Sequence, residues 1–203
     1  MLEIRHPLPA DLPGMYRICL ITGDAGNDAT GRHANPDLLG HIYTGAYAVR
    51  SPEFAYVVVD EHGVGGYVLA VPDTRDFEAW QEREWYPALR AQYPLSAFEG
   101  AAADTPDAAL VRLLHTPERR TDSVIERWPA HLHIDLAPRL QGRGLGRELI
   151  SRALDGIRSA GVKGLHLAVD PRNEGGKAFY PRVGFTRQPD AVEPGVVLFT
   201  IDL

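Results

Sequence analysis

The order of apolar and polar residues along the chain predicts an alternation of strands and helices. Short runs rich in apolar residues predict strands at 2–5, 54–60, 65–71, 131–136, 165–170 and 195–202. Longer stretches with apolar residues every three or four positions predict helices at 12–21, 36–48, 75–91, 107–115, 147–160 and 174–183. Because the helix at 147–160 separates two strands, we expect those strands to be parallel. The pattern predicts an α/β fold.

Local signals mark several ends of these elements. The link at 61–63 reads as the turn of a hairpin. Asp11 and Asn35 precede helical stretches, so we expect them to act as N-caps. Pro87 should interrupt the helix at 75–91, because a proline has no backbone N–H to donate.

The stretch 73–129 combines predicted helices with the large aromatic residues Trp80, Trp85 and Tyr86. We interpret it as a helical insertion that covers one end of the sheet, where it either only packs or forms a lid or wall of a substrate pocket. The same two roles, packing or substrate contact, are open to Tyr43 and Tyr47, which lie four residues apart on one helix face.

Size and composition narrow the class of protein. A chain of 203 residues with 44% hydrophobic residues suits one domain, 1–203, with a substantial core. The net charge of −6 argues against nucleic acid as a partner. Cys19 is the single cysteine and cannot form an intramolecular disulfide, which fits a reducing cytoplasm. Neither a signal peptide nor a membrane-spanning run is visible, so we expect a soluble, cytoplasmic protein.

A glycine-rich turn at 141–146, Gln-Gly-Arg-Gly-Leu-Gly, joins the strand at 131–136 to the helix at 147–160. The first N–H groups of a helix have no partner within the helix and carry partial positive charge, so a phosphate group is a natural ligand there. Glycines let a ligand approach the backbone closely. The turn therefore predicts a phosphate-binding loop, although it could also be only a tight corner.

Two common phosphate loops do not match this turn. The dinucleotide pattern G-x-G-x-x-G would need its third glycine at Arg147. The nucleotide-triphosphate pattern fails around Gly176 and Lys177, because Pro171 and Ala178 occupy its first glycine and its hydroxyl position. What remains is the pattern [Q/R]-x-x-G-x-[G/A].

This pattern resembles the pyrophosphate loop of the Gcn5-related N-acetyltransferases. A second stretch at 169–185, VDPRNEGGKAFYPRVGF, is similar to another signature of that family. The resemblance covers 1–72 and 131–203. It implies a GNAT fold with a mixed sheet splayed between the fourth and fifth strands, helices on both faces, and 73–129 inserted between the third and fourth strands. A bulge near 135–136 is expected to help open the splay.

Within that family, the chain looks most similar to bacterial relatives of the acetyltransferase-like C-terminal domain of O-GlcNAcase. The aromatic insertion and the strand HIDLAP carry this likeness. The eukaryotic domain is generally regarded as lacking the usual acetyl-CoA loop, whereas this chain keeps Gln141, Gly144 and Gly146.

The resemblance implies that acetyl-CoA is the cosubstrate and that no metal is needed. N–H groups of 142–147 should hold the pyrophosphate, with Gln141 and Arg143 as possible side-chain donors, and the main chain at 136–138 should pair with the pantetheine arm. The expected cofactor-binding residues are Leu136, Ala137, Pro138, Gln141, Gly142, Arg143, Gly144, Leu145, Gly146, Arg147, Asn173, Lys177, Phe179 and Tyr180.

The resemblance also implies the reaction, in which Tyr180 matches the family's general-acid tyrosine and the N–H of Leu136 should meet the oxyanion. An amine acceptor must lose a proton before it attacks. Asp135 is our first candidate for the base and His133 the second, since both lie with His131 on one face of the strand. All three could instead be hydrogen-bonded core residues. They could also suggest zinc, but acetyl transfer requires no metal.

These expectations describe an acetyl-CoA-dependent N-acetyltransferase that acts on a primary amine, either a protein lysine or a small molecule. The alternative is a catalytically silent module that binds acetyl-CoA or a peptide. The sequence names neither the acceptor nor the oligomeric state, because members of one fold family differ in such features.

Overall fold

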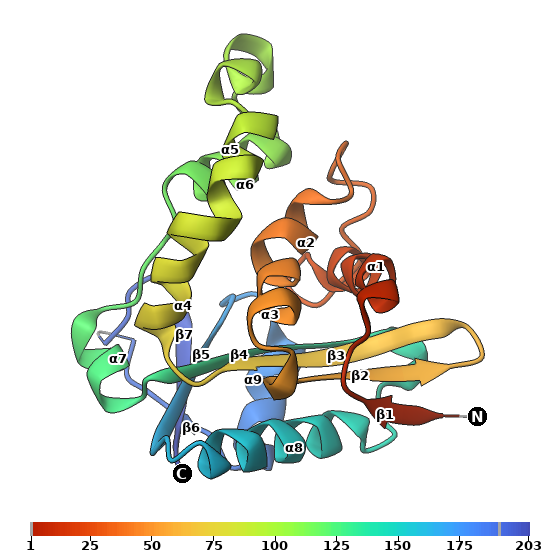
Figure 1. Ribbon diagram of the computed structural model, residues 1–203, viewed down its shortest axis with the longest axis vertical. Coiled ribbons are helices and arrows are strands. Elements are labelled where there is room, and N and C mark those ends of the chain that lie inside the picture. The colour runs from red at the N-terminus through yellow and green to blue at the C-terminus, as the bar shows by residue number, and fades with distance from the viewer. Residues whose placement is uncertain (1, 191) are drawn as a thin grey trace.

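Within residues 2–190 and 192–203, the part of the chain that the computed structural model describes, seven strands form one sheet in the order β1-β2-β3-β4-β5-β7-β6 (Figure 1). The strands are β1 (Glu3–Arg5), β2 (Ala55–Asp60), β3 (Gly63–Val71), β4 (Ala130–Leu136), β5 (Gly164–Val169), β6 (Thr186–Arg187) and β7 (Val197–Asp202). β4 and β5 are parallel, and the other neighbours are antiparallel. The predicted mixed sheet is confirmed; the short β6 was not predicted.

β4 and β5 lie in register only at their beginnings. Ala130 pairs with Leu165 and His131 with His166, and the register ends there although both strands continue. Beyond this point the strands separate into a wedge. The predicted splay between the fourth and fifth strands is therefore confirmed.

The prediction of a bulge near Asp135 and Leu136 is wrong. β3 and β4 advance residue by residue from Gly66 opposite Leu136 to Val71 opposite His131, whereas a bulge would put two residues opposite one. The irregularity lies instead between Val58 and Val59 of β2. The wedge thus opens because β5 diverges from β4, with no extra residue in β4.

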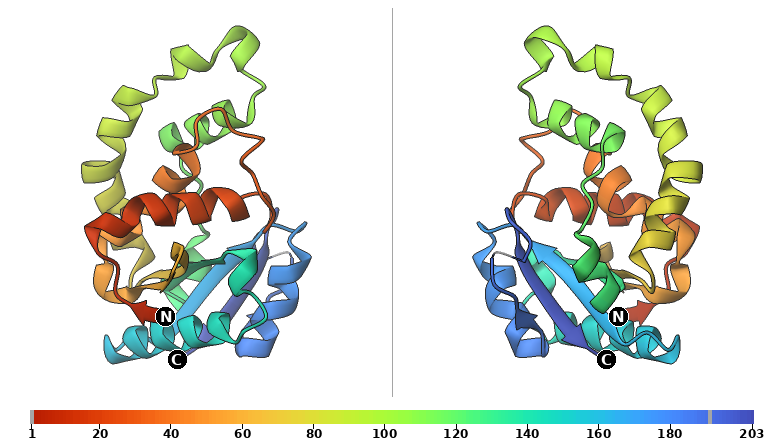
Figure 2. Two further views of the ribbon diagram at one scale, coloured as in Figure 1. Left: turned by 90° about the vertical axis from the view of Figure 1, so that its right-hand side faces the viewer. Right: turned by 90° about the vertical axis from the view of Figure 1, so that its left-hand side faces the viewer.

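Helices cover both faces of the sheet (Figure 2). On one face, the apolar side chains of β4 pack against α8 (Leu145–Ser159), with α9 (Glu174–Phe179) beside it. On the other face, Tyr67 and Leu69 of β3 pack against α1 (Leu12–Thr22) and α3 (Gly45–Arg50). Alternation along β4 therefore sends its apolar and its polar side chains to different helical layers.

The helix predicted at 36–48 is two helices, α2 (Leu38–Tyr43) and α3, which meet at Thr44. The Thr44 hydroxyl lies 3.2 Å from the Tyr67 hydroxyl of β3, a tertiary contact that residue spacing does not reveal. The expected caps also differ. Asn35 accepts from the N–H of Asp37, and Asp11 accepts from Arg5 and from the N–H of Leu8, so neither caps its helix through its side chain.

The stretch 73–129 rises from the sheet as a column of helices that returns at α7 (Figure 1). It contains α4 (Thr74–Trp80), a π-helix (Gln81–Trp85), α5 (Tyr86–Gln92), α6 (Pro106–His115) and α7 (Asp122–Arg127). The π-helix directly precedes Pro87, which cannot donate a hydrogen bond and whose ring crowds the carbonyl four residues earlier. The predicted interruption thus takes the form of a widened turn.

Short 3₁₀ helices complete the described structure at Pro9–Asp11, Pro52–Phe54, Leu95–Phe98, Gly100–Ala102, Pro138–Leu140 and Tyr180–Val183. Within the described ranges, helix length and hydropathy give no candidate for a bilayer-crossing helix.

Candidate active site

The loop after β4 presents its backbone to solvent. Gly142 and Gly144 have φ angles of 70° and 81°, in the left-handed region that favours glycine. A Cβ built on either would meet nothing within 4 Å, so open space adjoins the backbone there. Gly144 is the N-cap of α8, whose 15 residues align their dipoles toward this loop. The predicted phosphate-binding geometry is therefore present.

Gly146 serves a different purpose in the same loop. A Cβ at this position would lie 3.1 Å from Cζ of Phe179 and 3.6 Å from Cδ1 of Leu136. A small residue here lets the first turn of α8 approach both the end of β4 and α9. The contact explains in physical terms why the loop pattern ends in glycine or alanine.

Two loop side chains that we predicted as cofactor ligands bond to the protein itself. The Gln141 amide donates to the Leu136 carbonyl at 2.9 Å, and the Arg147 guanidinium donates to the Arg182 carbonyl at 2.8 Å. Both bonds stiffen the loop. Arg143 is exposed, and its side chain has no hydrogen bond or ion pair within the described part of the chain.

The backbone at the end of β4 is oriented by its pairing with β3. The N–H of Ala137 donates to the carbonyl of Gly65, which fixes the alternation of the ladder. The main-chain groups of Leu136 and Ile134 therefore point away from β3, toward the wedge. Because Gln141 occupies the Leu136 carbonyl, the N–H of Leu136 is the remaining group there. Pro138 has no N–H and ends the strand.

Asn173 and Lys177 hold the turn between β5 and α9. The Asn173 side-chain oxygen accepts from the N–H of Gly176 at 2.7 Å and so caps α9. The Lys177 ammonium donates to the Pro171 carbonyl at 2.6 Å and to Glu174 at 2.7 Å. Sequence reasoning assigned both residues to the cofactor, and it did not foresee these structural bonds.

Tyr180 follows α9 and packs among aromatic rings. Its ring centroid lies 5.4 Å from that of Phe179, 5.4 Å from that of Phe199 and 5.7 Å from that of Phe185. Its hydroxyl makes no hydrogen bond to any of the described residues. Burial raises the pKa of Tyr180 above the ordinary value, and the Asp135 carboxylate raises it further, so the phenol keeps its proton.

His131, His133 and Asp135 share one face of β4, as predicted, but their surroundings differ. His131 is fixed between the hydroxyls of Thr74 at 2.7 Å and Tyr47 at 2.8 Å. Asp135 accepts from the Tyr67 hydroxyl at 2.6 Å. Burial raises the pKa of Asp135, and the hydrogen bond from Tyr67 opposes that rise. These two residues are thus parts of buried polar networks.

His133 makes no hydrogen bond within the described residues. Its ring lies 5.7 Å from that of Tyr43 and 5.2 Å from that of Tyr47, so the pair predicted on one helix face meets the central strand here. Burial and, to a smaller extent, the charge of Arg120 lower the pKa of His133 to about 4. The imidazole is therefore neutral near pH 7.

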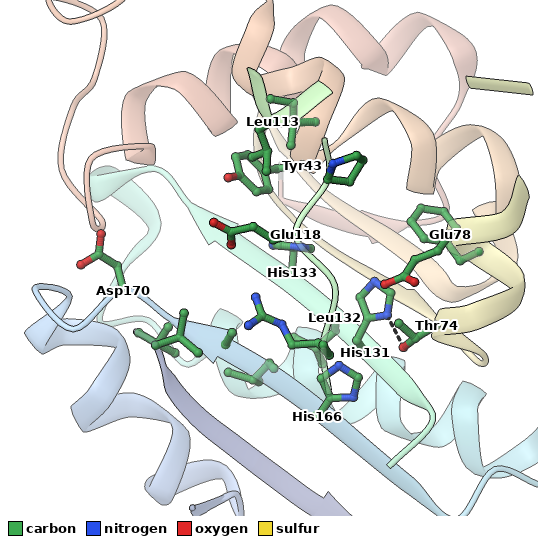
Figure 3. Close-up of a pocket in the computed structure, with 18 of the residues that line it drawn as sticks. Tyr43, Thr74, Glu78, Leu113, Glu118, His131, Leu132, His133, His166 and Asp170 are labelled. Carbon is green, nitrogen blue, oxygen red and sulfur yellow. Dashed lines mark hydrogen bonds between the residues drawn. The ribbon is translucent and has the colours of Figure 1, made fainter. Parts of the chain in front are cut away.

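A cavity of about 740 Å³ opens between the diverging strands and the helices above them (Figure 3). His131 and His133 of β4 line it together with His166, Leu167 and Ala168 of β5. Tyr43 and Tyr47 also line it. Asp135 does not line it. Its carboxylate accepts from the Tyr67 hydroxyl, and Thr22 of α1 also lies near enough to lower its pKa.

The stretch 73–129 supplies further lining residues, among them Phe77, Glu78, Gln81, Tyr86, Glu118 and Arg120. Sequence reasoning missed all of these except Tyr86, which it noted only as an aromatic of the insertion. No motif carries them, because three lie on the column of α4 and the π-helix and two on the segment that returns from α6.

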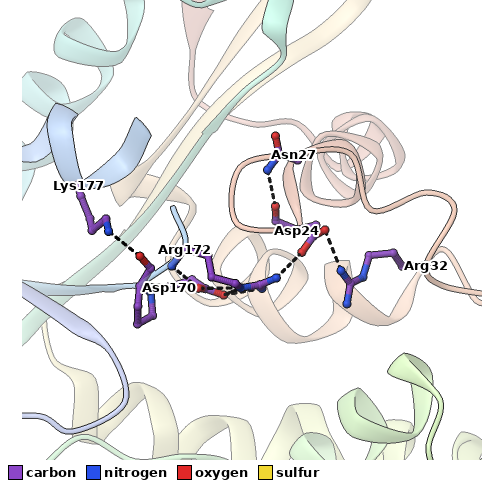
Figure 4. A network of polar contacts seen from close by, with 7 residues as sticks. Asp24, Asn27, Arg32, Asp170, Arg172 and Lys177 are labelled. Atoms are coloured by element: carbon purple, nitrogen blue, oxygen red, sulfur yellow. Dashed lines mark hydrogen bonds and ion pairs between the residues drawn. The ribbon is translucent and has the colours of Figure 1, made fainter. Parts of the chain in front are cut away.

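A second cavity of about 630 Å³ adjoins the first and shares Tyr43, Asp170 and Arg172 with it. Asp24, in the loop after α1, bonds Arg172 at 3.0 Å and Arg32 at 2.8 Å (Figure 4). Arg172 also bonds Asp170 at 2.7 Å. The loop after α1 is thereby tied to the turn after β5 at the mouth of the wedge.

The residues present fit acetyl-CoA better than a metal. Open backbone N–H groups at the start of α8 suit a pyrophosphate, and the wedge offers main-chain groups to an amide-bearing arm. Across 2–190 and 192–203, no group of three or more His, Cys, Asp or Glu side chains is arranged to hold a metal ion.

Comparison with known proteins agrees with this geometry. The model of the acetyltransferase (GNAT) family matches residues 36–185. The crystal structure of a protein named SsHAT is 34% identical, with a TM-score of 0.89, and the match covers 99% of this chain and 98% of that one. A Salmonella typhimurium protein described as an acetyltransferase, solved with its cofactor acetyl-CoA, has the same fold at 18% identity and a TM-score of 0.55, covering 100% and 94% of the two chains.

Among curated proteins, Protein O-GlcNAcase of Rattus norvegicus is 21% identical over 181 residues. The match covers 89% of this chain but only 20% of that protein, so the chain spans about a fifth of the length of this relative. The resemblance drawn from the two sequence signatures is confirmed, together with the predicted fold. On the match to its family model, the chain belongs to the acetyltransferase (GNAT) family.

Proposed function

We propose that this acetyl-CoA-dependent acetyltransferase moves the acetyl group directly to a primary amine, of a small molecule or of a protein lysine. One observation carries the proposal. The wedge between β4 and β5 joins an open glycine loop at one end to a cavity lined by neutral histidines at the other. Two substrates can thus meet across the sheet without moving between sites.

The loop end of the wedge supports cofactor binding. We assign the pyrophosphate to the N–H groups of 142–147, with the exposed Arg143 guanidinium as an added donor. Asn173, Lys177 and Phe179 shape the neighbouring turn. Gln141 keeps the end of β4 in place by its bond to Leu136. Acetyl-CoA, when bound, supplies an activated acetyl thioester.

Two groups of this chain act on the reacting atoms. The N–H of Leu136 points into the wedge and would donate to the thioester oxygen as negative charge develops on it. Tyr180 would give its proton to the departing sulfur. A model thiol has a pKa of about 8.5 and a phenol about 10, so this transfer is uphill and depends on the site compensating the phenolate.

The acceptor amine attacks in its neutral form and then carries a positive charge and an acidic N–H, and we propose His133 as the group that takes this proton as the nitrogen bonds to the carbonyl carbon. His133 lines the cavity with a neutral imidazole and no competing hydrogen bond in the described structure, whereas Asp135 is bonded to Tyr67 beneath the helices. This reverses our order of preference from the sequence. Asp135 then acts by holding the strand and by keeping the Tyr180 phenol neutral.

Calorimetry and turnover together test the function. Wild-type protein is titrated with acetyl-CoA and CoA and then assayed for acetyl-CoA consumption with a panel of amines. Tyr180→Phe should bind acetyl-CoA as the wild type does and lose about a hundredfold or more in kcat, because only proton transfer is removed. Absence of binding at high micromolar concentration contradicts the proposal.

The raised pKa of Tyr180 favours one rival, a module that binds acetyl-CoA or a peptide without chemistry. That rival predicts cofactor binding with no turnover of any amine. It also predicts that Tyr180→Phe changes nothing. Turnover that depends on Tyr180 excludes it.

We also propose that the chain is a single acetyltransferase domain and that 73–129 forms its acceptor-side wall. Support comes from the column formed by α4 and the π-helix, which lines the cavity through Phe77, Glu78 and Gln81.

A further inference from the structure

The charged side chains that line the large cavity are not balanced. Glu78, Glu118 and Asp170 contribute negative charge, and Arg120 and Arg172 contribute positive charge. Both arginines already have carboxylate partners. Arg172 bonds Asp170 and Asp24, and Arg120 lies 3.5 Å from Glu193.

Glu78 and Glu118 have no such partners. Neither forms an ion pair or a hydrogen bond with any residue in the described ranges. Glu78 is half-buried on α4, and Glu118 is exposed at the cavity's edge. Figure 3 shows both among the side chains that surround His131 and His133. Two carboxylates therefore face the cavity without an ion-paired cation, although Arg119, Arg75 and Arg120 lie near enough to act electrostatically on Glu78.

The charge of the histidines does not compensate these acids. Burial lowers the pKa of His133 and His166 to about 4 and that of His131 still further. Burial also raises the pKa of Glu78, and the positive charges of nearby arginines offset part of this rise. A bound cation would favour the ionised form of Glu78.

One further polar side chain is open to a ligand in the cavity. Gln81 lines the cavity and makes no side-chain hydrogen bond to the described residues. No fully buried side-chain nitrogen or oxygen of the described residues lacks a hydrogen-bond partner, so the Gln81 amide is accessible from the cavity although the residue is only 6% exposed. The π-helix that begins at Gln81 follows Glu78 of α4 by three residues, so both side chains reach the cavity from adjoining turns.

The remaining walls suit a short alkyl chain with charged ends. Tyr43, Tyr47, Phe77 and Tyr86 line the cavity, and aromatic rings accept both methylene groups and cations. A volume of about 740 Å³ lies in the range of small-molecule sites. A protein lysine would bring a single positive charge, located on the reacting nitrogen itself.

We infer that the acceptor is a small dication, an aliphatic amine with a second cationic group that Glu78 and Glu118 hold while the first amine faces His133. This inference rests on the proposed function. Glu78 and Glu118 are the residues that select the acceptor, and Gln81 adds a hydrogen bond to it.

The test compares acceptors of matched shape. Putrescine, a diamine, is assayed beside pentylamine, in which a methyl group replaces its second ammonium, and beside γ-aminobutyrate, in which a carboxylate replaces its terminal aminomethyl group. We expect putrescine to exceed pentylamine about tenfold in kcat/KM, with γ-aminobutyrate poorer still. Equal or better use of pentylamine or γ-aminobutyrate overturns the inference, and so does a lysine peptide used better than putrescine.

Charge-removing variants locate the effect. Glu78→Gln should lower kcat/KM about tenfold more for putrescine than for pentylamine. Glu118→Gln, at an exposed site, should have a smaller effect of about threefold. Glu84→Gln is the matched control, because Glu84 is exposed on the same column and does not line the cavity. Equal losses for both amines in Glu78→Gln would contradict a role in selection.

Calorimetry on the CoA complex separates this inference from the proposed function. If putrescine binds in a Glu78-dependent manner but no amine is acetylated, the proposed function fails and only the binding of a dication by Glu78 stands. If amines are acetylated without preference for a second charge, the proposed function stands and the inference fails. If putrescine neither binds nor reacts while other amines are acetylated, the inference alone fails, and if no amine binds or reacts, both fail.

Discussion

The two ends of the wedge are built on different principles. We call residues 136–147 with α9 the loop half, and the side chains that line the large cavity the cavity half. The loop half offers backbone groups, with φ angles of 70° and 81° at Gly142 and Gly144. The cavity half offers side chains from β4, β5, α2, α3 and the column formed by α4 and the π-helix.

This difference explains why the loop half can be shared across a family while the cavity half differs between its members. Backbone N–H groups recognise any phosphate of suitable shape, and they depend on a short, contiguous stretch of sequence. Side chains from separate segments can be exchanged one at a time without disturbing the strand pairing. A family can thus keep one cofactor while its acceptors vary.

The largest effect should come from removing a glycine of the loop half. Gly144→Val places a branched side chain at a φ of 81° and in the open space beside the N–H groups, so acetyl-CoA should bind about a hundredfold more weakly. Gly63→Val is the matched control, since Gly63 has a φ of 87°, equally open surroundings, and a place in the β2–β3 turn, outside the N–H groups of 142–147. Equal affinities in calorimetry for both variants would show that the loop does not hold the cofactor.

A smaller effect should come from the buried histidines of the cavity half, which make the free energy of unfolding depend on pH. Burial lowers the pKa of His133 from 6.5 to about 4, so between these values the unfolded chain binds more protons than the folded one. The free energy of unfolding should therefore fall as the pH drops from about 7 to 5, by about 2 kcal/mol for each such histidine. His166 behaves in the same way, while Asp135 and Glu78, whose pKa values burial raises, offset part of the loss.

Urea unfolding at several pH values measures this slope. His133→Gln should flatten it, and the exposed control His62→Gln should leave it unchanged. A slope that is the same in wild type and His133→Gln would mean that His133 does not stay neutral in the folded protein.

Much of the loop half could be predicted, because its determinants are local. Gly142, Gly144 and the start of α8 follow one another along the chain, and spacing alone separated them from other phosphate loops. Local sequence did not show where Gln141 and Lys177 would bond. Both donate to carbonyls that their own turns bring close.

The cavity half depends on contacts between distant residues, which sequence patterns do not encode. The break between α2 and α3 lies at Thr44, which contacts Tyr67 of β3, and the only local sign of the π-helix is the proline at 87. Glu78 and Glu118 come from segments without a motif. The available signals were the strand pattern of His131, His133 and Asp135, the pair Tyr43 and Tyr47, and the aromatic residues of 73–129. The strand pattern placed its three residues on one face, but it could not show that only the histidines line the cavity.

Cys19, the single cysteine, is buried, and burial raises its thiol pKa to about 12, so it cannot serve as a thiolate that carries the acetyl group.

Direct transfer requires both substrates in the wedge at once, and bisubstrate kinetics tests this most directly. Initial rates are measured with acetyl-CoA varied at several fixed concentrations of putrescine. The account predicts double-reciprocal lines that intersect. Parallel lines, which indicate an acetylated enzyme, would contradict it.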